Sequence, residues 1–341
     1  MEIESGKYDF DDAQPWAIVL AGGEGERLKP AVCRWLGEPC PKQYCTFLGN
    51  RSMLGHTWHR CRTLTSPDRV ITIIGAGHRR FLQRIRPEEQ TGRIIEQPVA
   101  RGTLPGLLLP LTYLMATNPR ATVFVFPSDH FVFPEERFLR FVRAAGLIAA
   151  CRPDRMVLLG AIPEGAESDY GWIQGEAAAD GSTRVHRISH FSEKPSRRKA
   201  RQLYKSGGFW NTMVFASRAR FLWDTIEQIF PEMILRFDLL RRVLRAVRMG
   251  RVTPSMEQVA LHHIYDSIGE TDLCRDLLQR IPEKLLLVPL EGVEWSDWGR
   301  PARIDESLRR LGRRPIFEEQ PAEALPAARP FGVPVGQAVA G

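Results

Sequence analysis

The 341-residue chain lacks long apolar runs and lacks the cysteine patterns of metal-binding or disulfide-rich proteins. No apolar run approaches the ~20 residues that a membrane-spanning helix requires, so we expect no membrane partner. The N-terminal stretch MEIESGKYDFDD is acidic and polar, unlike a secretory signal. The six cysteines form no CxxC pair and no zinc-type cysteine–histidine spacing. Together these absences predict a reduced, cytoplasmic setting.

Acidic residues are outnumbered by basic ones, which gives a net charge of +7. A basic excess can indicate nucleic-acid binding. Here the arginines are scattered along the polar faces of expected helices, and neither an RNA-binding aromatic motif nor a helix-turn-helix pattern is present. We therefore expect no nucleic-acid partner, and we keep nucleic-acid binding only as the weakest alternative. The charge fits a general attraction for small phosphorylated molecules.

Short apolar segments bounded by breakers alternate with segments of helical periodicity, which predicts an α/β architecture with a largely parallel sheet. The expected strands are 16–21, 70–75, 122–126, 156–162, 212–216 and 285–290. The expected helices are 52–64, 104–116, 134–150, 197–205, 218–230, 232–249, 273–280 and 303–311. An added antiparallel strand is expected within 180–194. One catalytic domain over 15–312 would follow an N-terminal tail (1–14) and precede a Pro/Ala-rich, disordered tail (313–341).

The sequence LAGGEGERLKP, residues 20–30, directly follows the first expected strand. Its glycines let the backbone turn sharply and bring bare N–H groups close to a ligand. Arg27 adds a fork of donors suited to phosphate, and Lys42 follows in PKQY. The combination predicts a cradle for a nucleoside triphosphate, with a ligand-free tight turn as the alternative.

Two other phosphate-binding loops are excluded by single positions. A dinucleotide GxGxxG loop would need glycine at 28, where leucine stands, and a Walker A loop would need a GKS or GKT run, which is absent. LAGGxGxRLxP followed by PKQY instead resembles the signature of sugar-phosphate nucleotidyltransferases, in particular the mannose-1-phosphate guanylyltransferase branch. The resemblance implies a Rossmann-like nucleotide-diphospho-sugar transferase fold with helices flanking a mixed, mostly parallel sheet. It assigns the nucleotide to Leu20, Ala21, Gly22, Gly23 and Gly25, and catalytic contacts to Arg27 and Lys42.

Two aspartates are the candidate metal ligands. Asp129 follows the expected strand 122–126, and ligands of open α/β sheets bind at the carboxyl ends of strands. A carboxylate beside triphosphate oxygens is what Mg²⁺ requires, whereas Asp129 lies too early to cap the helix near Pro134. Asp297, in EWSDWG, resembles the family's WSDxG motif, whose aspartate also faces the metal; an Asx-turn is the alternative.

Other motifs resemble the sugar-phosphate side of the family. FSEKP resembles an EKP motif, which implies that Lys194 contacts the phosphate and Glu193 the sugar hydroxyls. FWNT resembles WNSGM and points to Asn211, whose amide can both donate and accept, although Met213 stands at the family's glycine. DYG resembles GYGYI: Gly171 matches, and Asp169 replaces the first glycine.

QPVARGTLP resembles the EPxGRNTAP segment near the nucleotide base. Arg101 and Thr103 match this segment, whereas Gln97 and Gly102 replace Glu and Asn. Because these positions read the base, the replacements weaken the inference of guanine. A helix N-terminus with Thr103 near its cap is the alternative.

The sequence thus predicts Mg²⁺-dependent transfer of a nucleotidyl group from an NTP, GTP favoured, to a sugar-1-phosphate, mannose-1-phosphate favoured. The alternative is a catalytically weak regulatory homologue that binds nucleotide-sugars, motivated by the departures at 97, 102, 169 and 213. The sequence leaves homo-oligomerisation open.

Overall fold

The computed structural model describes residues 14–177 and 185–314. The predicted tails over 1–14 and 313–341 lie almost entirely outside the described residues, as do residues 180–184 of the strand expected within 180–194. The domain boundaries therefore stay predictions.

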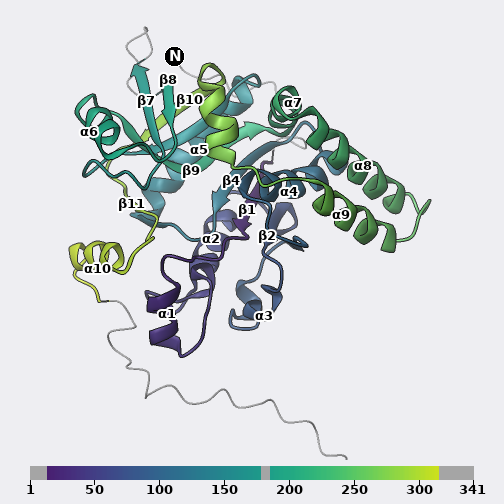
Figure 1. Ribbon diagram of the computed structural model, residues 1–341, viewed down its shortest axis with the longest axis horizontal. Helices are drawn as coiled ribbons and strands as arrows, with labels where there is room; N and C mark the ends of the chain where they lie inside the picture. The colour runs from purple at the N-terminus through teal and green to yellow at the C-terminus, as the bar shows by residue number, and fades with distance from the viewer. Residues whose placement is uncertain (1–13, 178–184, 315–341) are drawn as a thin grey trace, which may run out of the picture.

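A mixed sheet forms the middle of the molecule (Figure 1), with strand order β3-β2-β1-β4-β9-β6-β10-β8-β7 and a further pairing of β7 with β9. Its strands are β1 (Trp16–Ala21), β2 (Val70–Ile74), β3 (Arg93–Glu96), β4 (Thr122–Pro127), β6 (Met156–Ala161), β7 (Trp172–Ala177), β8 (His186–Ser192), β9 (Phe209–Arg218) and β10 (Leu285–Leu290). A small second sheet pairs β5 (Phe131–Phe133) with β11 (Glu294–Ser296).

The predicted mixed α/β sheet is confirmed, and its parallel pairs are β1–β2, β1–β4, β2–β3 and β6–β10. The antiparallel share is larger than expected because β9 runs against both of its neighbours, β4 and β6. The strand expected within 180–194 is β8, and it is antiparallel to β7. Since β1 and β4 are parallel neighbours, their carboxyl ends lie together, and Leu20 pairs with Pro127.

Helices cover both faces of the sheet because successive side chains of each strand point to opposite sides. Val19 of β1 belongs to the core under α2 and α5, whereas Ile18 belongs to the core under α4, α7, α8 and α9. The first face carries α1 (Lys29–Leu36), α2 (Met53–Arg62), α3 (Arg79–Leu82), α5 (Glu135–Cys151), α6 (Arg197–Lys205) and α10 (Pro301–Arg310). The second carries α4 (Thr103–Thr117), α7 (Ala219–Ile229), α8 (Pro231–Arg248) and α9 (Ser255–Ser267).

Some elements differ from the sequence expectation. The expected α-helix over 273–280 is instead a π-turn (Leu273–Leu277) followed by a 3₁₀ turn (Leu278–Arg280), started by Asp272, whose side chain accepts the N–H groups of Cys274 and Arg275. Helix α1 was not predicted, although Val32 and the partly buried Trp35 and Leu36 have helical spacing and pack against the core. Helix α9 and the short strands β3, β5, β7 and β11 were also missed.

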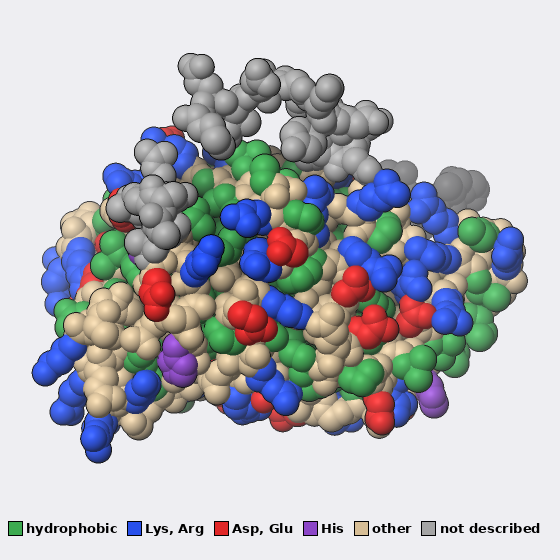
Figure 2. Space-filling view, turned by 90° about the horizontal axis from the view of Figure 1, so that it is seen from above, with side chains coloured by type: hydrophobic (Ala, Val, Ile, Leu, Met, Phe, Trp, Pro, Cys, Tyr) green, Lys and Arg blue, Asp and Glu red, His purple; other side chains and the backbone are tan. Residues whose placement is uncertain are grey.

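On the face shown in Figure 2 the basic side chains are spread out rather than gathered in one block. Figure 2 shows Lys and Arg side chains interspersed with Asp and Glu on one face. Within residues 14–177 and 185–314, no helix combines the length and the hydropathy needed to cross a bilayer.

Candidate functional site

The glycine loop follows the carboxyl end of β1 and is held by hydrogen bonds from Gln43, a side chain with no role predicted from the sequence. The Gln43 amide nitrogen donates to the carbonyl oxygens of Ala21 (2.9 Å) and Gly23 (2.7 Å). Gly25 has a φ of +65°, and a Cβ there would lie 3.1 Å from the backbone nitrogen of Lys42. The predicted turn therefore needs glycine at this position, and it brings Lys42 against the loop.

Gln97 lies directly against the glycine loop. A Cβ on Gly22 would come within 2.5 Å of the Gln97 amide nitrogen, so only glycine fits beside this side chain. Gln97 is 4% exposed, and its carbonyl oxygen is buried without a hydrogen-bond partner among the described residues. This oxygen lies 3.9 Å from where a Cβ on Gly106 of α4 would stand, whereas the amide nitrogen faces the glycine loop.

Lys42 joins the two predicted metal-binding acids. Its ammonium lies 2.9 Å from an Asp129 carboxylate oxygen and donates to the backbone carbonyl of Asp297. The Lys42 residue is 5% exposed, whereas the Asp129 side chain is 30% exposed. Helix α1 occupies the segment between Arg27 and Lys42, and the lysine still reaches the carboxyl ends of β1 and β4.

The Asp297 carboxylate is surrounded by donors. One oxygen accepts from Arg303 (2.8 Å), the Tyr170 hydroxyl (3.0 Å) and the Gly299 N–H (2.9 Å), and the other accepts from Arg27 (3.0 Å). This arrangement places Arg27 beside an acid as well as beside the glycine loop.

Both acids are held in their ionised form. Burial alone would raise the pKa of Asp297, but the charges of Lys42 and Arg303 outweigh it and hold this pKa well below its usual range. The pKa of Asp129 is likewise lowered, because the charge of Lys42 outweighs the effect of burial. Two carboxylates that stay charged suit a divalent cation.

The donor set of these acids fits magnesium only with help from a substrate. No group of three or more His, Cys, Asp or Glu side chains that could hold a metal occurs within the described ranges. Mg²⁺ takes one or two protein carboxylates and completes its shell with phosphates and water, so Asp129 and Asp297 fit that pattern. Arg27 must then leave Asp297, and its side chain, 51% exposed, has room to move.

The sugar-side residues also gather. The Asn211 N–H donates to the Gly171 carbonyl at 2.8 Å. A Cβ on Gly171 would lie 2.6 Å from a Glu193 carboxylate oxygen and 3.2 Å from the Asn211 Cβ. The structure thus brings Gly171, Glu193 and Asn211 together around one position where only glycine fits.

Lys194 stands at the open side of this group. Its side chain is 64% exposed, its φ is +43°, and its ammonium lies 3.6 Å from Glu193. Burial raises the pKa of Glu193, although the charge of Lys194 opposes that shift. Lys194 is therefore a weakly engaged cation beside a buried acid.

The Asn211 amide is fixed in orientation by two neighbours. Its oxygen accepts the Met213 N–H (3.1 Å), and its nitrogen donates to the Cys274 sulfur (3.4 Å). Met213, at the family's glycine position, has a left-handed φ of +58°. The position thus keeps a backbone conformation that favours glycine despite the substitution.

Arg101 and Thr103 bind the last turn of α9 and the segment that follows it, respectively. Arg101 donates to the Tyr265 carbonyl (2.9 Å), while the Thr103 hydroxyl donates to Asp272 (3.1 Å) and accepts the Leu273 N–H (2.7 Å). Thr103 is the first residue of α4, after Gly102, as the alternative interpretation expected. These contacts account for both side chains structurally; their nucleotide-binding role stays a prediction.

Sequence reasoning missed several residues that shape the site. Tyr170 and Gln43 lie inside the quoted motifs DYG and PKQY, which could have suggested them. Arg303 lies six residues beyond Asp297, in the first turn of α10, and Cys274 lies in the irregular turn after α9. No motif marks these two, because only the folded chain brings them to Asp297 and Asn211.

A twisted mixed sheet with a glycine loop at the end of its first strand, covered on both faces, is the nucleotide-diphospho-sugar transferase fold. A family model described as nucleotidyl transferase matches residues 16–306, and the chain belongs to this family.

Curated relatives and solved structures agree with this family. Over 234 residues the chain is 30% identical to "Mannose-1-phosphate guanylyltransferase 2" of Escherichia coli O157:H7, a match that covers 65% of this chain and 47% of that protein. It is 31% identical to "Alginate biosynthesis protein AlgA" of Pseudomonas fluorescens, covering 63% and 44%. The match thus spans less than half the length of these relatives.

The structural similarity extends over most of the chain. A crystal structure described as that of a "mannose-1-phosphate geranyltransferase" from Thermus thermophilus superposes with a TM-score of 0.70 at 22% identity, covering 88% of this chain and 79% of that one. At this identity the likeness establishes the fold alone.

Proposed function

We propose that the chain transfers a nucleotidyl group from an NTP to a sugar-1-phosphate, with GTP and mannose-1-phosphate as the favoured pair. One observation carries the proposal: Tyr170 and Gly171 are consecutive, and they touch different halves of the site. The Tyr170 hydroxyl binds Asp297, while Gly171 lies against Glu193 and Asn211. The acid pair and the sugar-side group are therefore neighbours, as a reaction between two bound phosphates requires.

The reaction would need positioning and charge neutralisation rather than a covalent intermediate. An oxygen of the sugar-1-phosphate attacks the α-phosphorus in line, and pyrophosphate leaves. The N–H groups of the glycine loop and Arg27 bind the triphosphate. Lys42 offsets the charge that develops at the α-phosphate, and Lys194 anchors the attacking phosphate.

Asp129 and Asp297 would hold Mg²⁺, which supplies charge neutralisation and orientation of the phosphates. In this role Asp297 would exchange its ion pair with Arg27 for the cation, which frees the arginine for the triphosphate. The ionised state of both acids, favoured by Lys42, supports this assignment.

The favoured substrates rest on resemblance and on one feature of the site. The names of the curated relatives include mannose-1-phosphate guanylyltransferase. The Gln97 amide, whose nitrogen lies beside Gly22, would contact the base, and guanine carries both donors and acceptors for an amide. Arg101 and Thr103 would then act by holding the end of α9 in place. The cytoplasmic setting stays a prediction.

A second candidate is a regulatory homologue with weak catalysis. It is favoured by Asp169, at the family's first glycine position of the DYG segment, whose carboxylate lies 3.5 Å from Arg27 and 2.6 Å from Arg300. This acid competes with a triphosphate for Arg27.

Pyrophosphate release with four NTPs against several sugar-1-phosphates tests the proposal. We expect turnover with GTP and mannose-1-phosphate, and none in matched reactions that lack either substrate or Mg²⁺. Asp169→Gly should raise a weak rate if the acid restrains Arg27. Tight nucleotide-sugar binding without pyrophosphate release from any pair would favour the regulatory homologue and contradict the enzyme.

A further inference from the structure

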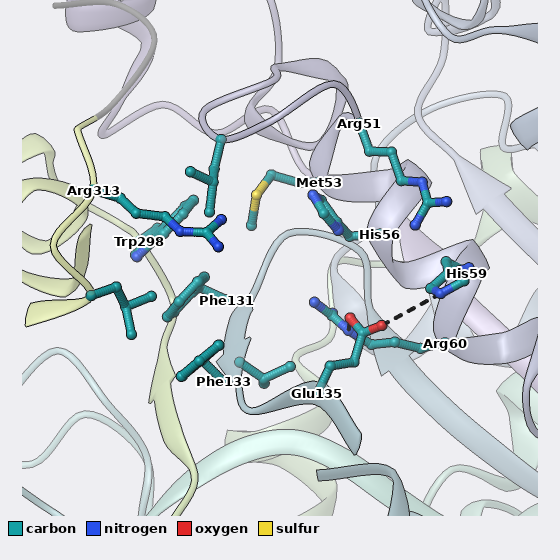
Figure 3. A pocket seen from close by; sticks show the side chains of 13 residues that line it. Arg51, Met53, His56, His59, Arg60, Phe131, Phe133, Glu135, Trp298 and Arg313 are labelled. Atoms are coloured by element: carbon teal, nitrogen blue, oxygen red, sulfur yellow. Dashed lines mark hydrogen bonds and ion pairs between the residues drawn. The ribbon is translucent and has the colours of Figure 1, made fainter. Parts of the chain in front are cut away.

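A second cavity lies behind the acid pair. It has a volume of about 240 Å³ and is enclosed by α2, β5, the residues after Asp297 and the end of α10 (Figure 3). None of the residues predicted to bind the nucleotide or the sugar phosphate lines it. The cavity is therefore separate from the proposed reaction site.

Two aromatic rings form an apolar wall of this cavity. Phe131 and Trp298 are stacked, with centroids 4.5 Å apart and planes 8° from parallel. Leu48 and Met53 add aliphatic surface. Phe133, which is 44% exposed, also lines the cavity and presents an accessible ring. An accessible aromatic ring favours a planar ring on a ligand.

The remaining wall is strongly basic. Arg51, Arg60 and Arg313 contribute guanidinium groups, and Glu135 is the single acid of the lining. Glu135 is already paired with Arg60 at 2.8 Å, whereas no ion-pair partner of Arg51 or Arg313 occurs in the described part of the chain. In Figure 3 Arg313 extends over Trp298, whereas the Arg51 guanidinium lies at the other end of the cavity, near His59. Two uncompensated guanidinium groups favour a phosphate-like anion.

A neutral histidine adds to the polar lining. Burial, reinforced by the nearby charge of Arg60, lowers the pKa of His56 to about 4. At neutral pH its imidazole is uncharged and can donate or accept a hydrogen bond. The lining therefore combines fixed positive charge, one neutral polar ring and an aromatic wall.

The cavity shares its walls with the segments that carry the acids. Phe131 stands two residues after Asp129, and Trp298 directly follows Asp297. The buried Arg60 also donates to the His130 carbonyl at 3.4 Å. A ligand that shifts the stacked rings must therefore act on the chain on both sides of the acid pair.

We propose that this cavity binds a small organic phosphate with a planar ring, and that its occupancy changes the activity of the neighbouring acid pair. The arginines bind the phosphate, and Phe133, beside the stacked Phe131 and Trp298, packs against the ring. The binding step is independent of the proposed nucleotidyl transfer, whereas the effect on activity rests on it.

Isothermal titration with phenyl phosphate tests the binding step on the full chain. We expect the double variant Arg51→Gln/Arg313→Gln to bind at least about 10-fold more weakly than the unaltered protein. The matched control Arg248→Gln/Arg251→Gln removes two exposed charges at the end of α8 and should bind like the unaltered protein. Inorganic phosphate should bind more weakly than phenyl phosphate, because it lacks the ring.

Equal affinity in the unaltered protein and the Arg51/Arg313 variant would overturn the proposal, as would equal weakening in both double variants. Equal affinity for phenyl phosphate and inorganic phosphate would overturn the ring-binding wall. Thermal melting of each variant confirms that it is folded.

Pyrophosphate release tests the effect on activity. Phenyl phosphate should change kcat/KM at least about 3-fold in the unaltered protein and in the Arg248/Arg251 control, but not in the Arg51/Arg313 variant. An equal change in all three proteins would mean that the probe acts at the reaction site, and it would overturn the effector role. If no substrate pair turns over, the proposed function fails, and the titration still decides whether the cavity binds.

Discussion

The glycine-loop half of the site is held together by charge, whereas the Gly171 half is held by backbone and neutral contacts. Lys42 bridges Asp129 and Asp297, and Arg27 pairs with Asp297. Around Gly171, the backbone N–H of Asn211 donates to the Gly171 carbonyl, and the Asn211 side-chain amide donates to the Cys274 sulfur. Lys194 is largely exposed.

This difference indicates how each half meets its ligand. Under the proposed function, a triphosphate and its cation would replace the internal partners of the charged half, so binding there would require exchange of ion pairs. The half around Gly171 has a largely exposed cation and a preformed wall, so a sugar phosphate would bind there with little rearrangement. The pKa shifts agree, since those of Asp129 and Asp297 are lowered and that of Glu193 is raised.

The largest expected effect is that of Asp129→Asn. The substitution removes a metal-binding charge and leaves Lys42 without its carboxylate partner, so turnover should fall about 10²–10³-fold. Pyrophosphate release at saturating substrates measures this loss, and circular dichroism checks the fold. Near-normal turnover in a folded variant would sink the metal assignment.

Next come the two phosphate-binding cations, which should separate the halves kinetically. Arg27→Gln should raise mainly the KM for the NTP. Lys194→Gln should raise the KM for the sugar-1-phosphate about 10–100-fold, because one charge-assisted contact is lost. The matched control Lys205→Gln removes an exposed charge from the last turn of α6 and should change neither value. If Lys194→Gln altered only the KM for the NTP, the assignment of halves would be wrong.

A smaller effect is expected from a methyl group in the sugar-side wall. In Gly171→Ala the new Cβ would meet Glu193 at 2.6 Å, so the wall must shift and the KM for the sugar-1-phosphate should rise about 10-fold. Gly165→Ala is the control, because nothing lies within 4 Å of its Cβ. Steady-state kinetics with each substrate varied in turn measure this KM. An unchanged KM for the sugar-1-phosphate would contradict the assignment of Gly171 to the sugar-side wall.

The smallest effect concerns stability. Because the pKa of Glu193 is raised by burial, its contribution to stability is favourable below the unfolded value and is lost as the pH rises through the folded pKa. Above the folded pKa the ionised carboxylate therefore opposes folding, and Glu193→Gln should increase the free energy of unfolding there.

Asp297→Asn should have the opposite sign. The lowered pKa of Asp297 gives stability that is present above the unfolded value of about 3.9 and is lost only as the pH falls through the folded pKa. Urea unfolding at pH 7 compares the two variants. If both substitutions lowered the free energy of unfolding, the carboxylates of Glu193 and Asp297 would both stabilise the fold, and the predicted difference between the two halves would be wrong.

The sequence predicted the parts of the fold that carry strong local signals. Strand β1 and the glycine loop stood out because an apolar run meets several glycines, and helix α6 was predicted with its observed bounds. Helix α1 was missed because it has only eight residues, too few for the spacing of Val32, Trp35 and Leu36 to stand out. The larger antiparallel share of the sheet depends on where β9 inserts, which is a long-range choice that no local pattern records.

The site shows the same limit. Asp129 and Gly171 were recognisable from their motifs, but the role of Arg303 depends on α10 folding back onto Tyr170 and Asp297. The contact of Cys274 with Asn211 joins residues 63 positions apart. Such pairs carry no signal in one sequence, because either residue alone is unremarkable in its own segment.

The Gln43 side chain affects which charge a ligand of the glycine loop can carry. By donating to the carbonyls of Ala21 and Gly23, it occupies the groups through which bare backbone would attract cations. The N–H groups of the loop would then be left for an anion, as the proposed function requires. The neutral Gln43 amide would thereby favour anions over cations at the carboxyl end of β1.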